Sequence, residues 1–328
     1  MRKIISSSLL LLLLSSACSQ NNTSPINSEA PVEESYTFDR WASSENYEIT
    51  INSTNGERIK LTRNHKDYKP SWSKDGRRLT FFRMLEFEQG FGISKTKICV
   101  VNSDGSGLRL ITKGDYPDFN PTWTRDGTNM ILFTRYDREP FLRMKIYMIS
   151  PDGLPGDEML LSDPSFQYSE WACSGLKDGR IFIDRWVGSN LKSFLLTPSP
   201  GKKGKYEEIK RPTSLYWHKL SVSPSETKVA YMRYGHNERA FEDAIICYAD
   251  FDVNNRVISN QVEVTKFNSN CIFEYPRWST DEKYLIYDCN VTGKFQIYAY
   301  RLSDGFVQII SLNSNIDSMY GNFDSLPK

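Results

Sequence analysis

The chain has 328 residues, and its 41 Lys and Arg residues nearly balance its 40 Asp and Glu residues. This near-neutral composition argues against a nucleic-acid partner, which usually requires a basic surface. Beyond the N-terminal leader, no stretch shows sustained helical periodicity. We therefore expect one large all-β domain.

Residues 1–17 have the features of a bacterial lipoprotein signal peptide. Arg2 and Lys3 give a positive start, and the apolar run 4–14 is too short to span a bilayer as a stable anchor. Ser-Ser-Ala-Cys follows and resembles a lipobox, although Ser15 stands where an apolar residue is usual. We predict lipidation at Cys18. The alternative is an ordinary secretory signal that is cleaved nearby.

Residues 18–35 are polar, contain two prolines and show no apolar periodicity. Such a segment predicts a flexible tether between the lipid and a folded domain at 36–328. If enterobacterial sorting rules apply, the absence of Asp after Cys18 favours the outer membrane, with the domain facing the periplasm or the surface. The N-terminal lipid would be its contact with the membrane.

A hairpin-like pattern repeats through the domain. Its clearest copies are Pro-Ser-Trp-Ser-Lys-Asp-Gly at 70–76 and Pro-Thr-Trp-Thr-Arg-Asp-Gly at 121–127, each followed by a short apolar run. Asp-Gly makes a tight turn because Gly accepts a positive φ, and the Trp segment and the apolar run form the two strands. We align five markers, spaced 51, 48, 51 and 56 residues apart, and a last worn copy: Trp72, Trp123, Trp171, Val222, Trp278 and Phe323.

A second unit alternates with the first. It is a strand, a turn and a strand ending near Leu-Thr, as at 97–112 and 296–311. Each repeat thus holds four short strands, A to D, and four-stranded units at this period are typical of a β-propeller. A ring must close, because an open strand edge is a hazard. We predict that segment 36–62 shares one blade with segment 321–326, which completes six blades.

These motifs resemble the TolB-type propeller repeat, and the resemblance covers nearly all of 36–328. It is specific for the fold and unspecific for function. Propellers of this type serve as a periplasmic binding scaffold, as the non-catalytic domain of prolyl-oligopeptidase-like enzymes, and as oligogalacturonate lyase. The resemblance therefore implies the fold, and the function has to be inferred from the residues of the binding site.

The sequence offers little for catalysis. It has no Gly-x-Ser-x-Gly elbow, and its three histidines, His65, His218 and His236, are assigned to connections, where they could share one face or be unrelated. We expect no enzyme, metal or cofactor. The alternative is an envelope hydrolase or lyase acting on carbohydrate or peptide at the channel mouth, with a carboxylate pair. A tight carboxylate pair or a three-His metal site in the channel would favour that alternative.

One face of a propeller carries the D–A and B–C connections, and we call it the loop-rich face. Here these connections are longer and richer in aromatic and charged residues than the hairpins of the opposite face. Aromatic side chains with a polar tip bury area at low entropic cost. The candidate partner-binding residues are His65, Tyr68, Tyr116, Tyr168, Trp217, His218 and Tyr275. The alternative is that they pack between blades.

Four of the five predicted B strands end at an arginine, which is a sharper pattern: Arg83, Arg135, Arg185 and Arg233. The last B strand has Asp288 and Asn290 there instead. A guanidinium offers a planar fork of donors to carboxylate or phosphate, so we predict a ligand- or partner-binding site on the loop-rich face. The alternative is that each Arg pairs with a neighbouring carboxylate such as Asp137, Glu139 or Asp184.

Five cysteines remain beside Cys18, namely Cys99, Cys173, Cys247, Cys271 and Cys289. An exported protein can oxidise them, and Cys271 and Cys289 flank one predicted hairpin, so this pair is the favoured disulfide. Buried free thiols are the alternative.

The sequence as a whole predicts a lipid-anchored, six-bladed propeller of the cell envelope. We expect it to bind a protein, a peptide or an envelope glycan through the loop-rich face. A third possibility is that the protein is an accessory subunit that works only within a larger assembly.

Overall fold

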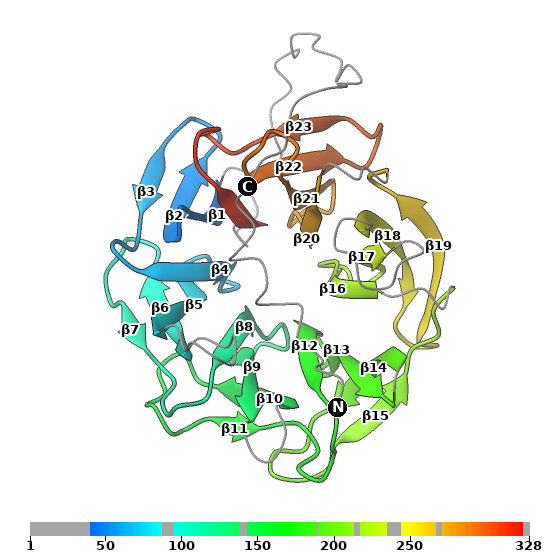
Figure 1. Ribbon diagram of the computed structural model, residues 1–328. Helices are drawn as coiled ribbons and strands as arrows, with labels where there is room; N and C mark the ends of the chain where they lie inside the picture. The colour runs from blue at the N-terminus through cyan, green and yellow to red at the C-terminus, as the bar shows by residue number, and fades with distance from the viewer. Residues whose placement is uncertain are drawn as a thin grey trace, which may run out of the picture.

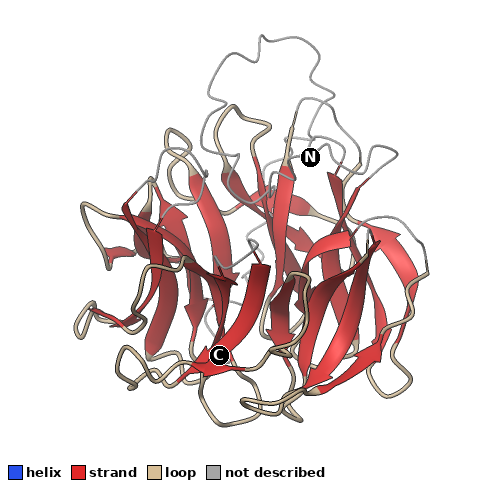
Figure 2. Ribbon diagram, turned by 60° about the horizontal axis from the view of Figure 1, so that its bottom comes forward, coloured by secondary structure: helices blue, strands red, loops and turns tan. Residues whose placement is uncertain are grey.

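The computed structural model describes residues 40–86, 95–137, 143–188, 190–212, 217–234, 244–266 and 271–323. In these ranges every regular element is a β-strand (Figure 2). They accordingly contain no helix of the length and apolarity that a membrane span needs. The predicted leader, the tether, Cys18 and His236 lie outside the described residues.

The strands form six four-stranded antiparallel sheets, the blades of a propeller (Figure 1). From the axis outward, blade 1 holds β24 (Ser318–Phe323), β1 (Arg40–Glu45), β2 (Glu48–Ser53) and β3 (Arg58–Lys60). Blade 2 holds β4 (Lys66–Trp72), β5 (Arg78–Glu86), β6 (Lys95–Asn102) and β7 (Arg109–Leu110). Blade 3 holds β8 (Asp118–Trp123), β9 (Ile131–Asp137), β10 (Arg143–Ile149) and β11 (Met159–Leu160).

The other three blades follow the same order. Blade 4 holds β12 (Glu170–Gly175), β13 (Ile181–Val187), β14 (Asn190–Thr197) and β15 (Lys205–Glu208). Blade 5 holds β16 (Trp217–Val222), β17 (Lys228–Tyr234), β18 (Ala244–Asp252) and β19 (Val257–Glu263). Blade 6 holds β20 (Phe273–Trp278), β21 (Tyr284–Cys289), β22 (Gln296–Arg301) and β23 (Val307–Ile309). The predicted number of blades is confirmed.

Blade 1 closes the ring with strands from both ends of the domain. In Figure 1 the red strand β24 lies beside the blue strand β1, and the two pair antiparallel from Trp41 opposite Phe323 to Glu45 opposite Ser318. A Cβ on Gly321 would lie 2.9 Å from the side chain of Ile297, so the backbone of β24 packs directly on blade 6. The predicted shared blade is confirmed.

The marker tryptophans join neighbouring blades. The indole Nε1 of Trp123 donates to the carbonyl of Ser71 at 2.9 Å, in the preceding blade. Trp278 donates in the same way to the carbonyl of Ser221 at 2.9 Å, and Trp72 to the carbonyl of Asn322 at 3.1 Å. Each indole thus fills the space between two sheets and fixes their relative position.

The turn after each marker explains the rest of the motif. Ser73 Oγ donates to Asp75 Oδ1 at 2.6 Å, and the same oxygen accepts from the Arg77 N–H at 3.2 Å. These hydrogen bonds lower the pKa of Asp75. Gly76 has a φ of 63°, the left-handed conformation that glycine adopts without strain. The Ser-x-Asp-Gly sequence is therefore a complete turn.

Blade 4 departs from the predicted alignment. Gly175, opposite Ile181, occupies the place that Trp72 takes opposite Leu79, and the predicted marker Trp171 lies four residues earlier. A Cβ on Gly175 would be 3.3 Å from the backbone of Thr124, so the preceding blade approaches too closely for an indole. The spacing of 48 residues between Trp123 and Trp171 is close to that of the other markers. Spacing alone therefore did not reveal that the marker position in this strand is four residues later.

Arg125 bridges the place where that indole is missing. From the turn of blade 3 its guanidinium donates to the carbonyls of Val222 and Ser223 in blade 5, at 2.9 Å each. The side chain therefore reaches past blade 4 and joins two blades that are not neighbours.

We predict that Arg125→Met lowers the free energy of unfolding by about 2–4 kcal/mol, because it removes two charge-assisted hydrogen bonds to backbone carbonyls. Lys74→Met is the matched control, since Lys74 occupies the same turn position in blade 2 and is exposed. Chemical denaturation of both variants measures the effect. Equal stability of the two variants would contradict the bridging role.

Four cysteines are buried free thiols in the structure, namely Cys99, Cys247, Cys271 and Cys289. Cys271 and Cys289 are hydrogen-bonded to each other. The structure thus places the predicted pair in contact but shows the thiol form, which is the alternative considered above.

Candidate functional site

The predicted arginines of blades 2, 3 and 4 each face a carboxylate of the innermost strand. Arg83 Nε donates to Asp67 Oδ1 at 2.7 Å, and the pair is directly opposed between β4 and β5. Arg135 Nε likewise donates to Asp118 Oδ1 at 2.6 Å. These partners lie on the adjacent strand rather than nearby in the sequence. Of the carboxylates named from proximity, Glu139 lies outside the described residues.

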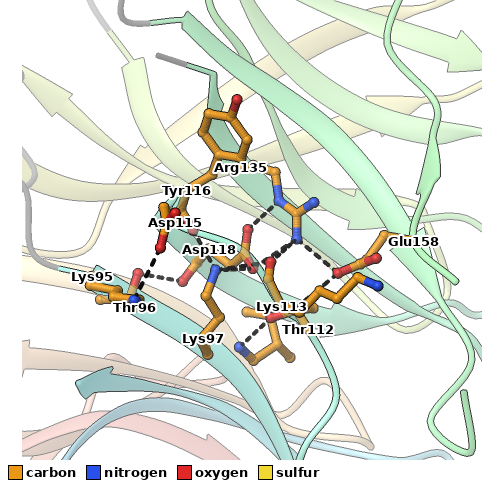
Figure 3. A network of polar contacts seen from close by, with 11 residues as sticks. Lys95, Thr96, Lys97, Thr112, Lys113, Asp115, Tyr116, Asp118, Arg135 and Glu158 are labelled. Carbon is orange, nitrogen blue, oxygen red and sulfur yellow. Dashed lines mark hydrogen bonds and ion pairs between the residues drawn. The ribbon is translucent and has the colours of Figure 1, made fainter. Parts of the chain in front are cut away.

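Asp118 joins blades 2 and 3 (Figure 3). It accepts from Arg135 and also from Lys97 of the preceding blade, at 3.2 Å. Arg135 pairs in addition with Glu158 at 3.0 Å. Burial lowers the pKa of Lys97, and the Asp118 charge opposes that shift. The cluster is a closed structural network of two cations and two anions.

Arg185 and Arg233 are paired as well. Arg185 Nε lies 3.1 Å from Glu170 Oε2, and its guanidinium covers the Tyr206 ring at 3.9 Å. Burial raises the pKa of Glu170. Arg233 pairs with Glu263 on the outermost strand of blade 5. Pairing with carboxylates, the alternative reading of this pattern, is thus what the structure shows, and an incoming anion would have to displace a built-in partner.

The predicted aromatic and histidine residues divide into an exposed and a buried group. His65, Tyr116 and Tyr168 are exposed on the loop-rich face. Trp217 is fully buried and stacks on Tyr231 at 3.8 Å, so its predicted place in a surface loop is wrong. Strand β16 begins at Trp217, so this residue belongs to the innermost strand of blade 5 and not to a connection.

The buried group extends toward the axis. Tyr68 is buried between the rings of Tyr47 and Phe82, at 5.5 and 5.1 Å. His218 belongs to strand β16 rather than to a connection, and its ring meets Trp171 edge-on at 5.4 Å. Tyr275 lies in β20, among residues that meet at the centre of the ring.

A β-bulge recurs in the innermost strands, where a residue three before the marker position has a positive φ. These residues, with φ of 53°, 53°, 54°, 52° and 60°, are Lys69, Asn120, Lys219, Tyr275 and Tyr320. Because non-glycine residues adopt this conformation at a cost, the bulge is a built feature that aims their side chains away from the blade. We call these five, together with His218, Glu274 and Asp288, the axial cluster.

Contacts within the axial cluster cross the ring. Lys69 of blade 2 lies 4.1 Å from the centre of the Tyr275 ring of blade 6, although blade 1 separates these blades. Its Nζ also donates to Asn120 of blade 3. Tyr275 and Tyr320 meet edge to face at 4.7 Å. The axis is therefore occupied by interacting polar side chains.

Lys219 supplies the second cation of this cluster. Its ammonium lies 3.7 Å from the centre of the same Tyr275 ring and pairs with Glu274. Burial lowers the pKa of His218 to about 3, with Lys219 and Lys69 adding to the shift. His218 is therefore neutral at physiological pH.

Glu274 and Asp288 form a carboxyl pair within blade 6. They are directly opposed between β20 and β21, and both are fully buried. Burial raises the pKa of Asp288 to about 8, with the Glu274 charge adding to the shift and a hydrogen bond from the Tyr320 N–H, at 2.8 Å, opposing it. Asp288 thus holds its proton at neutral pH, beside the Glu274 side chain that pairs with Lys219.

Some polar atoms of the cluster lack partners. His218 Nδ1, Glu274 Oε2 and Asp288 Oδ1 are buried and accept or donate no hydrogen bond within the described ranges. They are three of the sixteen buried side-chain atoms without a hydrogen-bond partner in the described residues, and each is open to a hydrogen bond with water or a ligand. The part of the chain that the structure describes contains no group of three His, Cys, Asp or Glu residues suited to a metal ion.

The sequence analysis missed most of this site. It grouped Glu274 with His218 and Tyr275 in the D–A connections but did not single out Lys69, Asn120 and Lys219. The signal was present, because the three residues share one offset from the repeat marker. Asp288 was noticed where other B strands have Arg.

A scan of protein-family models and a search of curated proteins gave no match. Solved structures share the fold. TolB from Acinetobacter baumannii matches with a TM-score of 0.64 at 14% identity, over 88% of this chain and 67% of that one. Hydrazine synthase from Kuenenia stuttgartiensis matches with a TM-score of 0.62 at 13% identity, over 90% of this chain. This chain spans 48% of the hydrazine synthase chain.

A chain of the nidogen/laminin complex matches with a TM-score of 0.60 at 10% identity, over 87% of this chain and 98% of that one. Identities this low show the fold alone. The chain is a six-bladed β-propeller with a TolB-like fold.

We predict that Asp288→Asn stabilises the protein, increasingly so from pH 5 to pH 8. Asp288 holds its proton to about pH 8 when folded, whereas an unperturbed Asp ionises near 3.8. Between these values the unfolded state binds fewer protons, so the native protein loses up to about 1.4 kcal/mol per pH unit as pH rises. Asn cannot ionise, so the variant lacks this loss.

Thermal or chemical unfolding across that pH range measures the difference. Asp115→Asn is the control, because Asp115 is exposed. Stability curves of wild type and Asp288→Asn that run parallel from pH 5 to pH 8 would contradict a buried, protonated Asp288.

Proposed function

We propose that this chain is a lipid-anchored binding module of the cell envelope that captures a protein partner through its loop-rich face. The observation that carries the proposal is a set of exposed apolar and aromatic side chains at the ends of strands on that face. They belong to blades 1, 2, 4 and 6 and to the connections before blades 3 and 4: Tyr47, Leu85, Tyr116, Tyr168, Val187 and Val291. Among them, Tyr116 and Tyr168 are exposed aromatic side chains of the kind that protein interfaces favour.

The rigid ring supports this function. Each of the six blades is a hydrogen-bonded sheet and β24 closes the ring, so the strand ends at the loop-rich face are held at fixed positions with little ordering cost on binding. Nidogen and laminin form a complex in which a chain of the same fold takes part. TolB-like scaffolds also motivate the envelope location, and the leader ending at Cys18 motivates the lipid anchor.

The anchor has a direct test. Expressed in a bacterium with lipoprotein processing, the full-length protein should fractionate with membranes and carry the mass of a lipid on Cys18. Cys18→Ser should release it into the soluble envelope fraction. Membrane association that persists without lipid in the variant would contradict the anchor.

The face also has a test. We expect Tyr116→Ser combined with Tyr168→Ser to weaken capture of the envelope partner by roughly tenfold or more, because two exposed aromatic anchors are lost. The control is Leu108→Ser with Leu154→Ser, which alters exposed residues in turns of the opposite face. Cross-linking of purified protein to detergent-solubilised envelope, with mass spectrometry, measures capture. Equal loss in both double variants would contradict a role of the loop-rich face.

A second candidate function is an envelope hydrolase or lyase acting on carbohydrate or peptide. The opposed Glu274 and Asp288 favour it, since one protonated and one ionised carboxyl are the usual pair for general acid–base work. Turnover of an envelope glycan or peptide that Asp288→Asn abolishes would favour this candidate, and unchanged turnover in that variant would reject the pair as its catalyst.

A further inference from the structure

Lys69 lies at the centre of the ring, with its side-chain nitrogen beside Asn120 and two tyrosine rings. Its described contacts are the hydrogen bond to Asn120 and the faces of two tyrosine rings, Tyr275 at 4.1 Å and Tyr320 at 5.6 Å. Among the described residues it has no ion pair with a carboxylate. An ammonium has three N–H donors, so two of them lack a described acceptor. Burial of such a cation is costly unless something pairs with it.

Other charged groups also act on Lys69. Burial lowers the pKa of its amine, and the nearby cations Lys219 and Arg277 lower it further, whereas Glu274 and Asp288 raise it. Glu274 already pairs with Lys219, and burial raises the pKa of Asp288 to about 8. Among the described residues, Lys69 therefore has no carboxylate of its own.

Lys69 and two of its neighbours are also partly accessible. Lys69, His218 and Tyr320 lie deep within the ring, yet each side chain keeps part of its surface accessible to a molecule the size of water. The unpartnered atoms His218 Nδ1 and Asp288 Oδ1 belong to the same cluster. A protonated Asp288 can donate to a ligand oxygen, as can one tautomer of neutral His218.

We propose that the axial cluster binds a small oxyanion, a carboxylate or phosphate group, with the Lys69 ammonium as its principal partner. Asp288 and His218 supply neutral hydrogen-bond donors, and the Tyr275 and Tyr320 rings hold the ammonium in place. Glu274 is kept from repelling the anion by its pair with Lys219. This site is distinct from the loop-rich face and does not rest on the function proposed for it.

The first test uses acetate and inorganic phosphate as probes on the purified protein, at constant ionic strength set with sodium chloride. Binding is measured by calorimetry and by the shift in Tm. We expect one or both probes to bind, and Lys69→Met to weaken binding by roughly tenfold or more, because a buried charge partner is lost. Lys66→Met is the matched control, since Lys66 is exposed on the same strand and should leave binding unchanged.

A response to acetate alone identifies a carboxylate site, and a response to phosphate alone identifies a phosphate site. Both are forms of the proposal. The proposal would be overturned if neither probe binds, or if wild type and Lys69→Met bind the probes equally.

The second variant, Asn120→Asp, places a carboxylate where Asn120 already accepts from Lys69. Asp tolerates the left-handed φ of 53° found there. If Lys69 needs a counter-ion, this variant should unfold at a higher Tm than wild type and should no longer respond to the probe. A lower Tm together with an unchanged response would overturn the proposal even if Lys69→Met fails to fold.

Discussion

The hydrogen bond from an indole Nε1 to a carbonyl of the preceding blade is the interaction on which the ring depends. It ties blade 1 to 2, blade 2 to 3 and blade 5 to 6. Each one satisfies a carbonyl of the innermost strand, while the ring of the Trp fills the wedge between two twisted sheets. Where Gly175 and Val222 replace Trp, the structure uses the Arg125 bridge from blade 3 to blade 5 instead.

This interaction also determines what lies at the centre. The carbonyl acceptors Ser71 and Ser221 come two residues after the bulged Lys69 and Lys219. Once the indole fixes that segment, the bulge is fixed with it, and the side chain with positive φ is held in place toward the axis. The packing motif and the axial cluster are therefore two consequences of one strand geometry.

The sequence predicted what depends on period and turn chemistry, and it failed where the outcome depends on register. Four strands per repeat, six blades and the shared blade all follow from the spacing and the turn residues. The partner of Arg83 lies 16 residues earlier, on the adjacent strand, and that of Arg135 lies 17 earlier. No local pattern reveals such pairs until the strands are aligned. The same limit explains Trp171, since a shift within one strand exchanges a marker with a neighbour at nearly unchanged spacing.

Stability alone does not explain why the side chains at the axis are polar and charged. Three blades already contain complete Arg–carboxylate pairs, so the fold can neutralise a buried charge when pairing alone is required. At the axis it does not do so, because Lys69 faces Asn120 where a carboxylate would cost nothing in space. Asp288 is buried at the expense of its charge, and its second oxygen has no partner within the described ranges. Unpaired charge in a rigid, buried place is costly for folding. An anion that pairs with Lys69, as proposed above, would account for this arrangement.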